Sequence, residues 1–354
     1  MPYGSRGHDS SDDLSRDAED EVFDLELRAT DGTLLRGTLR EPDGRAPRAT
    51  IVFAHAMFAR RSEWEKPRGF GLAARFAKLG YRTISFDFRA HGDSASGPAK
   101  DGGDAYDAFV RHDLPAVVAC AKDRGGLVIV VGHSLGGHVA LASQGLGALG
   151  ADALVVAGAN VWHRPFEPSR ATFLAQSLAA RAMGALVRGA GRFPARALRL
   201  GSDDASPGAL SVFLRTANGG VWRSDDGRDD YFAALTRVDV PVCAILSTGD
   251  TFICRPTSGE RFLARTRGKK KVILVTRADD GGAPPDHMGL VTTEACRRAW
   301  DTAIAWAHEQ STGPSRPTSL GEGAWEEPRG AEARSPGERT PKAPPSTTPD
   351  RGDA

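Results

Sequence analysis

The chain has 354 residues and a net charge of +1, with 40% hydrophobic and 26% charged residues. This composition is typical of a soluble globular protein, and with a near-zero charge and no long basic block nothing points to binding of nucleic acid or of an anionic membrane. No uncharged apolar stretch approaches the roughly 18 residues that a membrane span needs, so we expect none.

The start of the chain and the spacing of its cysteines indicate in which cellular compartment the protein is expected. The first residues, MPYGSRGHDSSDD, lack the apolar region of a secretory signal, so we expect no secretion by that route. Scattered cysteines without metal-binding spacing predict buried free thiols. They are Cys120, Cys243, Cys254 and Cys296. Free thiols favour a reducing compartment, and the expected location is cytoplasmic.

Both ends of the chain are polar. Residues 1–20 are rich in charge, and residues 311–354 are rich in Pro, Ser, Thr, Gly and charged residues. Segments of this composition bury too little apolar surface to fold, which predicts a disordered arm and a disordered tail. The folded body is therefore expected over residues 21–310.

A hairpin opens this body, and strands alternate with helices after it. The segment 23–41 alternates apolar and polar residues around Asp31-Gly32, as two antiparallel strands joined by a turn do. Continuous apolar runs predict the next strands, and helical spacing predicts the helices between them. The strands are expected at 49–56, 82–88, 126–133 and 151–159, and the helices at 66–80, 108–123 and 135–146.

Prolines indicate how two of these helices begin. Pro67 is expected in the first turn of the helix over 66–80, and Gly80 at its end. The apolar residues with helical spacing in that helix are Phe70, Ala73, Phe76 and Leu79. Within 108–123, Pro115 must start a helix or kink one, because proline lacks a backbone N–H.

The alternation stops over residues 160–236, which contain helical fragments at 171–191 and 208–219 without a clear strand. It resumes with strands at 240–250 and 269–280 and helices near 256–266 and 293–310. Strands that alternate with helices predict a parallel sheet covered on both faces. We therefore expect an α/β core, 21–159 and 237–310, with residues 160–236 inserted over the carboxyl ends of the strands, where open α/β sheets place their sites.

The segment VVGHSLGGHVA, residues 130–140, contains a G-x-S-x-G motif between a predicted strand and a predicted helix. That context is the one in which the serine of the motif is a nucleophile, exposed on a strained turn. Gly132 and Gly136 would leave room for close chain crossing. Ser134 is thus the predicted nucleophile, and the Leu135 N–H at the helix start would point toward a developing oxyanion.

A serine hydroxyl needs a base, and His287 is the best of nine histidines. It follows the last predicted strand in a loop at the carboxyl edge of the sheet, the edge that also carries Ser134. His133 is next to the serine and cannot fold back onto it. His138 lies one turn along the next helix, and His163 could line a pocket.

The base needs an acid that holds it in one tautomer. Asp250 ends the predicted strand 240–250 and gives the chain order Ser134, Asp250, His287. Other carboxylates at the same edge compete with it, each with a simpler explanation as a turn residue. These competitors are Asp279, Asp280 and Asp286.

Five segments together resemble, in order, the landmarks of the α/β-hydrolase superfamily. They are FAHAMF (53–58), FDFRAHGDS (86–94), GHSLGG (132–137), LSTGDTF (246–252) and DHMGLV (286–291). Within the superfamily, the chain is most similar to the serine-aminopeptidase-like and lysophospholipase-like bacterial hydrolases. The resemblance implies an α/β-hydrolase fold, with a mostly parallel central sheet, helices on both faces and a helical cap formed by 160–236.

The resemblance also implies roles for individual residues. Met57 would supply the second oxyanion N–H, although Ala56 stands where the family usually has Gly, which could displace this backbone slightly. His55, Asp87 and Arg89 would be structural. Apolar residues of the inserted segment would fit a pocket for an acyl or alcohol group, and packing against the core would explain most of them equally well. They are Val161, Trp162, Phe166, Phe173, Leu174, Phe213, Leu214 and Trp222.

The leading hypothesis is a serine hydrolase that cleaves a small-molecule carboxylic ester or thioester with an apolar group. The triad would be Ser134, Asp250 and His287, and the reaction would need neither a metal nor an organic cofactor. One alternative is an amidase or aminopeptidase with the same triad, using the acidic cluster 224–230 to bind a substrate ammonium. The other is a binding protein that keeps the fold without catalysis.

Overall fold

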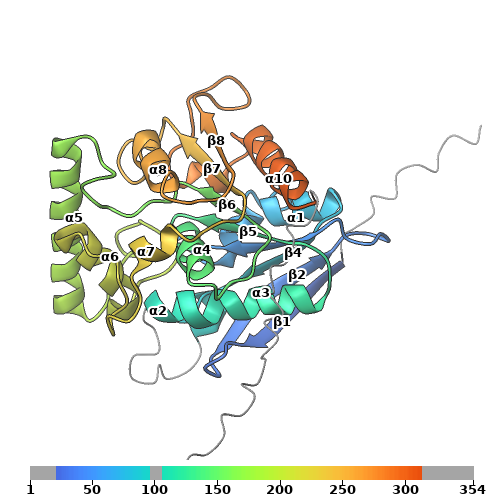
Figure 1. Cartoon of the computed structure of the whole chain (residues 1–354), viewed down its shortest axis with the longest axis horizontal. Coiled ribbons are helices and arrows are strands. Elements are labelled where there is room, and N and C mark those ends of the chain that lie inside the picture. Colours follow the sequence, from blue (N-terminus) through green and yellow to red (C-terminus); the bar gives the residue numbers. More distant parts are fainter. Residues whose placement is uncertain (1–20, 96–105, 313–354) are drawn as a thin grey trace, which may run out of the picture. The chain divides into compact units, whose positions relative to one another are not determined.

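An eight-stranded sheet runs through the computed structural model, which describes residues 21–95 and 106–312 (Figure 1). The strands lie in the order β1-β2-β4-β3-β5-β6-β7-β8. They are β1 (Glu21–Arg28), β2 (Leu34–Glu41), β3 (Thr50–Ala54), β4 (Arg82–Phe86), β5 (Val128–His133), β6 (Ala153–Ala157), β7 (Val242–Ser247) and β8 (Lys270–Val275). From β4 to β8 the neighbouring strands pair in parallel, whereas β1 with β2 and β2 with β4 are antiparallel. The predicted opening hairpin and mostly parallel sheet are confirmed.

Helices cover both faces of this sheet. They are α1 (Leu72–Lys78), α2 (Tyr106–Ala108), α3 (Leu114–Asp123), α4 (Leu135–Gly145), α5 (Arg170–Ala190), α6 (Pro207–Gly219), α7 (Tyr231–Leu235), α8 (Pro256–Leu263), α9 (Gly289–Thr292) and α10 (Arg297–Thr312). Strand side chains alternate between the two layers. In β3, Val52 packs in the cluster that contains α3, α4 and α8, while Ile51 and Phe53 pack in the cluster that contains α1 and α10. Both faces of the central strands are therefore buried, as their unbroken apolar sequence requires.

Two expected helices begin later than the sequence indicated. Over 66–80 only α1 forms, because Gly71 lies against the backbone of Glu65, where a Cβ would come within 2.3 Å. Phe70 and Leu79, expected on its buried face, are exposed. The last helix, α10, starts at Arg297 rather than at Thr293.

The expected helix over 108–123 is a composite. A π-helical turn, Phe109–Asp113, lies between α2 and α3, and Pro115 stands in the first turn of α3. The missing N–H of a proline costs nothing there, since the first turn of a helix has no internal acceptor for it.

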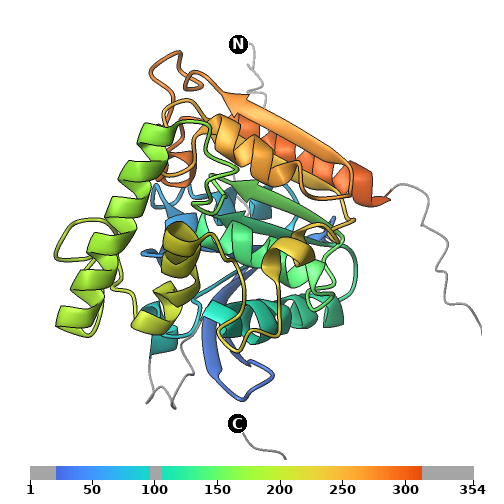
Figure 2. The same ribbon diagram turned by 60° about the vertical axis from the view of Figure 1, so that its left-hand side comes forward.

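Residues 160–236 contain α5, α6 and α7 and contribute no strand to the sheet. Figures 1 and 2 show α5 and α6 side by side, with α5 on the side away from the sheet. Their role as a cap stays a prediction. Residues 1–20 and 313–354 lie outside the described part, so the disordered arm and most of the disordered tail stay predictions. Residues 311 and 312, expected in the tail, belong to α10.

Neither a membrane span nor a disulfide is found in the described residues. No helix there is both long and apolar enough to cross a bilayer. The four cysteines are free, with Cys120 partly exposed and the other three buried.

Candidate active site

Ser134 stands at a sharp turn between β5 and α4. Its backbone has φ 50° and ψ −110°, a conformation that is rare for a residue other than glycine. The turn is held because Ser134 N–H donates to Ala157 O at 2.9 Å, from the neighbouring strand β6. Such a locally strained residue persists only when its surroundings fix it, and strain of this kind is concentrated at functional sites.

The two glycines of the motif are required by close backbone approach. A Cβ on Gly132 would lie 2.4 Å from Gly137 N, and one on Gly136 would lie 2.1 Å from Ala54 O. Both distances are far below van der Waals contact, so no larger residue fits without moving the backbone. The motif therefore brings β3, β5 and the start of α4 together around Ser134.

Asp250 and His287 are hydrogen-bonded to each other at the carboxyl edge of the sheet. His287 Nδ1 lies 2.5 Å from Asp250 Oδ2, and both side chains are buried. The other carboxylate oxygen, Oδ1, accepts the N–H groups of Ile253 and Cys254, each at 3.0 Å. With the carboxylate ionised, Nδ1 carries the proton, which leaves Nε2 of His287 as the basic nitrogen.

Hydrogen bonding keeps the Asp250 carboxylate ionised. Burial raises its pKa, but the hydrogen bond and charge of His287 and the two N–H donors outweigh this, so the pKa lies below its ordinary value of 3.8. The pairing therefore stabilises the fold fully above the ordinary pKa, and this contribution is lost as the pH falls through the lowered pKa.

The competing carboxylates are used for other local contacts. Asp286, next to His287 in sequence, accepts Gly289 N–H at 2.7 Å. Asp280 accepts Gly282 N–H at 2.9 Å. Asp279 accepts Arg298 N–H at 2.9 Å, near the start of α10. Each is thus a turn or helix-start residue, the simpler explanation that the sequence offered.

Ser134 and His287 both line one cavity of about 350 Å³. Its other lining residues are Ala56, Met57, Phe58, Ala59, His138, Asn160, Trp162, Ala179, Met183, Phe193, Leu200, Phe213, Phe252, Ile253 and Met288. Within the described part of the chain, no Asp, Glu, Lys or Arg lines the cavity. Burial lowers the pKa of His138 to about 3, so this histidine is neutral at physiological pH. The cavity therefore suits an uncharged, largely apolar group.

The sequence identified only part of this lining. Of the eight apolar residues expected in a pocket, Trp162 and Phe213 line the cavity, whereas Leu174 is 57% exposed and Trp222 is buried elsewhere. His163 does not line it. The additional residues come from loops, from α4 and from α5, and only tertiary packing brings them together.

The two proposed oxyanion donors lie near Ser134. Met57 lines the cavity, and Leu135 is the first residue of α4. Neither N–H donates a hydrogen bond to a described residue, so both are available for a ligand. The Ala56 N–H donates to the buried Glu63 carboxylate at 2.9 Å, a contact that holds the backbone next to Met57.

His55 has a structural position. Its Nε2 accepts Phe88 N–H at 3.0 Å, and its Nδ1 lies 2.7 Å from Ala56 O. Burial lowers its pKa to about 3. A neutral His55 with a proton on Nδ1 satisfies both contacts and links β3 to the loop after β4.

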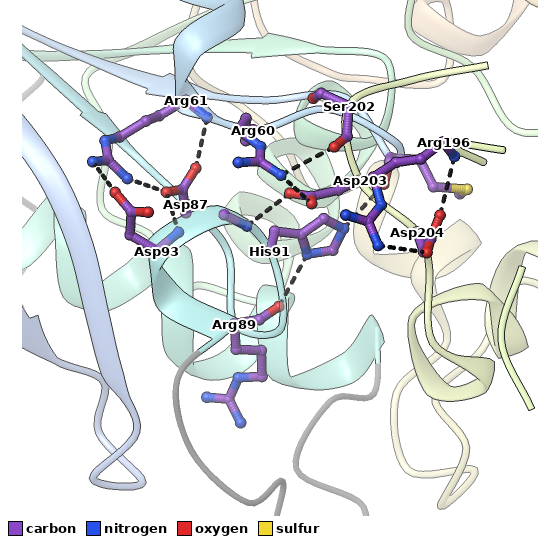
Figure 3. A network of polar contacts seen from close by, with 12 residues as sticks. Arg60, Arg61, Asp87, Arg89, His91, Asp93, Arg196, Ser202, Asp203 and Asp204 are labelled. Atoms are coloured by element: carbon purple, nitrogen blue, oxygen red, sulfur yellow. Dashed lines mark hydrogen bonds and ion pairs between the residues drawn. The ribbon is translucent and has the colours of Figure 1, made fainter. Parts of the chain in front are cut away.

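A polar network joins the inserted segment to the loop that carries Met57 (Figure 3). Phe58 O accepts the N–H groups of Ser202 and Asp203, at 2.8 and 3.0 Å. The Asp203 carboxylate pairs with Arg60 and accepts Gly92 N–H at 2.7 Å. No local sequence signal distinguishes Asp203 from any other surface aspartate, so this connection depends on the fold.

Replacing Asp203 by Asn is expected to lower kcat about 10- to 100-fold and to change KM little. The substituted amide would direct a donor at Arg60 or at Gly92 N–H, which loosens the loop that holds the Met57 N–H. The measurement is steady-state hydrolysis of a p-nitrophenyl ester.

Asp204→Asn is the matched control, because among the described residues the Asp204 carboxylate accepts hydrogen bonds only from Arg196, within the same segment (Figure 3). Equal losses in the two variants, or a raised KM at unchanged kcat for Asp203→Asn, would show that Asp203 does not act through the Met57 loop.

Across residues 21–95 and 106–312, no group of three or more His, Cys, Asp or Glu side chains is arranged to hold a metal ion.

Comparison with known proteins identifies the family. The model of the alpha/beta hydrolase family matches residues 51–299. No curated protein matches the sequence. The expected subgroup of aminopeptidase-like and lysophospholipase-like hydrolases stays a prediction.

Solved structures share the fold at low identity. DcsB in complex with its substrate analogue is 17% identical, with a TM-score of 0.56 over 83% of this chain and all of that one. An esterase from Exiguobacterium antarcticum is 19% identical and has a TM-score of 0.53. The match covers 80% of this chain and 99% of the esterase. An esterase from Pyrococcus furiosus is 17% identical and has a TM-score of 0.53. The match covers 82% of this chain and 91% of the esterase. Because the family model matches residues 51–299, more than half of this chain, the chain belongs to the alpha/beta hydrolase family.

Proposed function

We propose that the protein is a serine hydrolase that cleaves a carboxylic ester or thioester carrying an apolar group. Membership in the family supports a hydrolase activity. The observation that carries the finer proposal is the buried hydrogen bond between His287 and Asp250, at the cavity that Ser134 lines. The esterases of the same fold are consistent with it but show the fold alone.

The proposed reaction proceeds through an acyl-enzyme. Ser134 Oγ attacks the carbonyl carbon while His287 Nε2 takes its proton, and Asp250 stabilises the resulting imidazolium. The Met57 and Leu135 N–H groups bind the oxyanion. Nε2–H then protonates the departing alcohol or thiol as its bond to the carbonyl carbon breaks. A water molecule attacks the acyl-serine, gives its proton to Nε2, and releases the acid as Ser134 recovers its proton.

A fluorophosphonate probe tests whether Ser134 is an activated nucleophile. We expect one adduct per chain by intact mass, and peptide mapping should place it on residue 134. Ordinary serines do not react, because only an adjacent base makes the hydroxyl nucleophilic. A folded protein that stays unlabelled would favour the non-catalytic binding protein, and an adduct on another serine would contradict the assigned nucleophile.

The aminopeptidase alternative is disfavoured by where the acidic cluster 224–230 lies. Asp226 and Asp229 pair with Arg111, and Asp225 pairs with Arg215. None of them lines the cavity. A substrate ammonium would therefore enter an apolar cavity without a carboxylate partner, which costs several kcal/mol.

The kcat/KM values for ester and aminoacyl-amide substrates should accordingly differ strongly. We expect kcat/KM for a p-nitrophenyl acyl ester to exceed that for an aminoacyl p-nitroanilide by on the order of 10³-fold or more. A neutral N-acylated anilide is the control, because it keeps the amide bond and removes the ammonium. Faster cleavage of the free aminoacyl anilide than of both others would support the aminopeptidase.

A further inference from the structure

The nearly neutral net charge hides a strongly basic segment. Residues 168–202 contain six arginines and no Asp, Glu or Lys, within a chain whose net charge is +1. The arginines are Arg170, Arg181, Arg188, Arg192, Arg196 and Arg199, and all are exposed. The segment comprises α5 and the connection that leads toward α6.

One exposed stripe of α5 combines these cations with leucines. Arg170, Leu174, Leu178, Arg181 and Arg188 follow at intervals of 4, 4, 3 and 7 residues, which keeps them on one side of a helix. Leu174 and Leu178 are 57% and 54% exposed, which is unusual for leucine. We call these five residues the arginine–leucine face. Figures 1 and 2 show α5 beyond α6, on the side away from the sheet.

The cations of this face lack anionic partners among the described residues. Of the six arginines in 168–202, only Arg196 forms an ion pair there, with Asp204. Arginines held on a helix without carboxylates repel one another. An anionic surface that neutralises them would remove this repulsion.

The cavity adjoins the same helix. Ala179 and Met183 line it from α5. Leu200 and Phe252 line it as well and are themselves 54% and 38% exposed. Ala179 and Met183 follow Leu174 by 5 and 9 residues, about 140° and about 180° around the helix axis, so the cavity lies on the other side of α5 from the arginine–leucine face.

We propose that the arginine–leucine face docks on an anionic lipid surface. Its leucines would enter the headgroup region and its arginines would contact lipid phosphates, as amphipathic helices rich in Arg and Leu do. This departs from the expectation from net charge alone, which gave no indication of membrane binding. The docking is independent of the proposed function.

Charge and exposed leucine together favour lipid over other occupants. A symmetric second copy would place the same unpaired cations against each other. A nucleic acid or acidic protein would pair the arginines but gives no reason for leucines between them. Of these occupants, only a lipid interface supplies both negative charge at its headgroups and an apolar layer just below them, within reach of the leucines of a helix that lies in the interface.

Vesicle sedimentation of the full chain tests the docking without any turnover. We expect binding to phosphatidylcholine vesicles with about one third phosphatidylglycerol, weaker binding at high salt, and little binding to pure phosphatidylcholine. The double variants Arg181→Gln/Arg188→Gln and Leu174→Gln/Leu178→Gln should each bind roughly tenfold more weakly or worse. None of these four residues lines the cavity, so hydrolysis of a soluble ester should stay at the wild-type level and report correct folding.

The matched controls are on other surfaces. Lys269→Gln/Lys271→Gln removes two cations at the start of β8, and Leu79→Gln removes a 44% exposed leucine after α1. Both controls should bind vesicles like the wild type.

Four outcomes would overturn the proposal. They are absence of wild-type binding to the anionic vesicles, full binding by the leucine variant, loss of binding in the lysine control, and a dimer in size-exclusion chromatography that the leucine variant dissociates. The second would indicate a purely electrostatic polyanion site, and the fourth an interface between two copies. A protein that binds vesicles but is not labelled by the fluorophosphonate would retain the docking and lose the proposed catalysis.

Discussion

Ser134→Ala is expected to lower kcat for a p-nitrophenyl ester by about a millionfold, which is the typical cost of losing the nucleophile of such a triad. The loss should be this large because His287 has no other hydroxyl to activate at the cavity: Ser134 is the only Ser, Thr or Tyr in the described lining. What remains should be the modest acceleration that oxyanion donors and substrate binding give to attack by water, about 10³- to 10⁴-fold over solution. The measurement is single-turnover and steady-state hydrolysis.

Ser143→Ala is the matched control for this variant. Ser143 lies on the same helix, α4, is fully buried, and has no hydrogen-bond partner for its hydroxyl within the described residues. Removing that hydroxyl leaves no acceptor unpaired, so activity and stability should stay near wild type. If Ser134→Ala keeps more than a few per cent of the wild-type kcat, another group is the nucleophile.

Asp250→Asn is expected to lower kcat by about 10⁴-fold with little change in KM. The substituted side-chain amide would favour the His287 tautomer that accepts at Nδ1 and carries the proton on Nε2, and such an imidazole cannot take a proton from Ser134. The substitution would also remove the negative charge that stabilises the imidazolium. Fluorophosphonate labelling of the variant should slow in parallel with kcat, since both depend on the same base.

Asp286→Asn distinguishes the assigned acid from its neighbour in sequence. Asp286 contacts Gly289 N–H, which an Asn side-chain oxygen can also accept, so we expect activity close to wild type. Loss of activity in Asp286→Asn together with an active Asp250→Asn would reverse the assignment of the acid. Circular dichroism and thermal melting of each variant separate a catalytic loss from unfolding.

The local sequence pattern determined the main elements and the turn at Ser134. Unbroken Val and Ile runs such as β5 belong to strands buried on both faces, and Gly132 and Gly136 fit only where backbones nearly touch. The start of α1 could not be predicted in this way, because the position of Gly71 depends on the chain packed against it, at Glu65.

The sequence pattern also identified His287 and Asp250 as partners. Both follow parallel strands, and the carboxyl ends of parallel strands meet at one edge of the sheet, so chain order was sufficient to bring them together. The hydrogen bond between them is present in the structure, and its catalytic role is the prediction tested above.

What the sequence by itself determined is therefore whatever depends on neighbours along the chain: strand and helix type, the strained turn at Ser134, and the edge at which the polar side chains gather. Only the tertiary structure decided the lining of the cavity, the contact of Asp203 with the Met57 loop, and the exposure of arginines and leucines on α5. The physical reason is that these features depend on distances between segments far apart in the chain and on which side chains packing leaves in water, and neither quantity has a local periodicity.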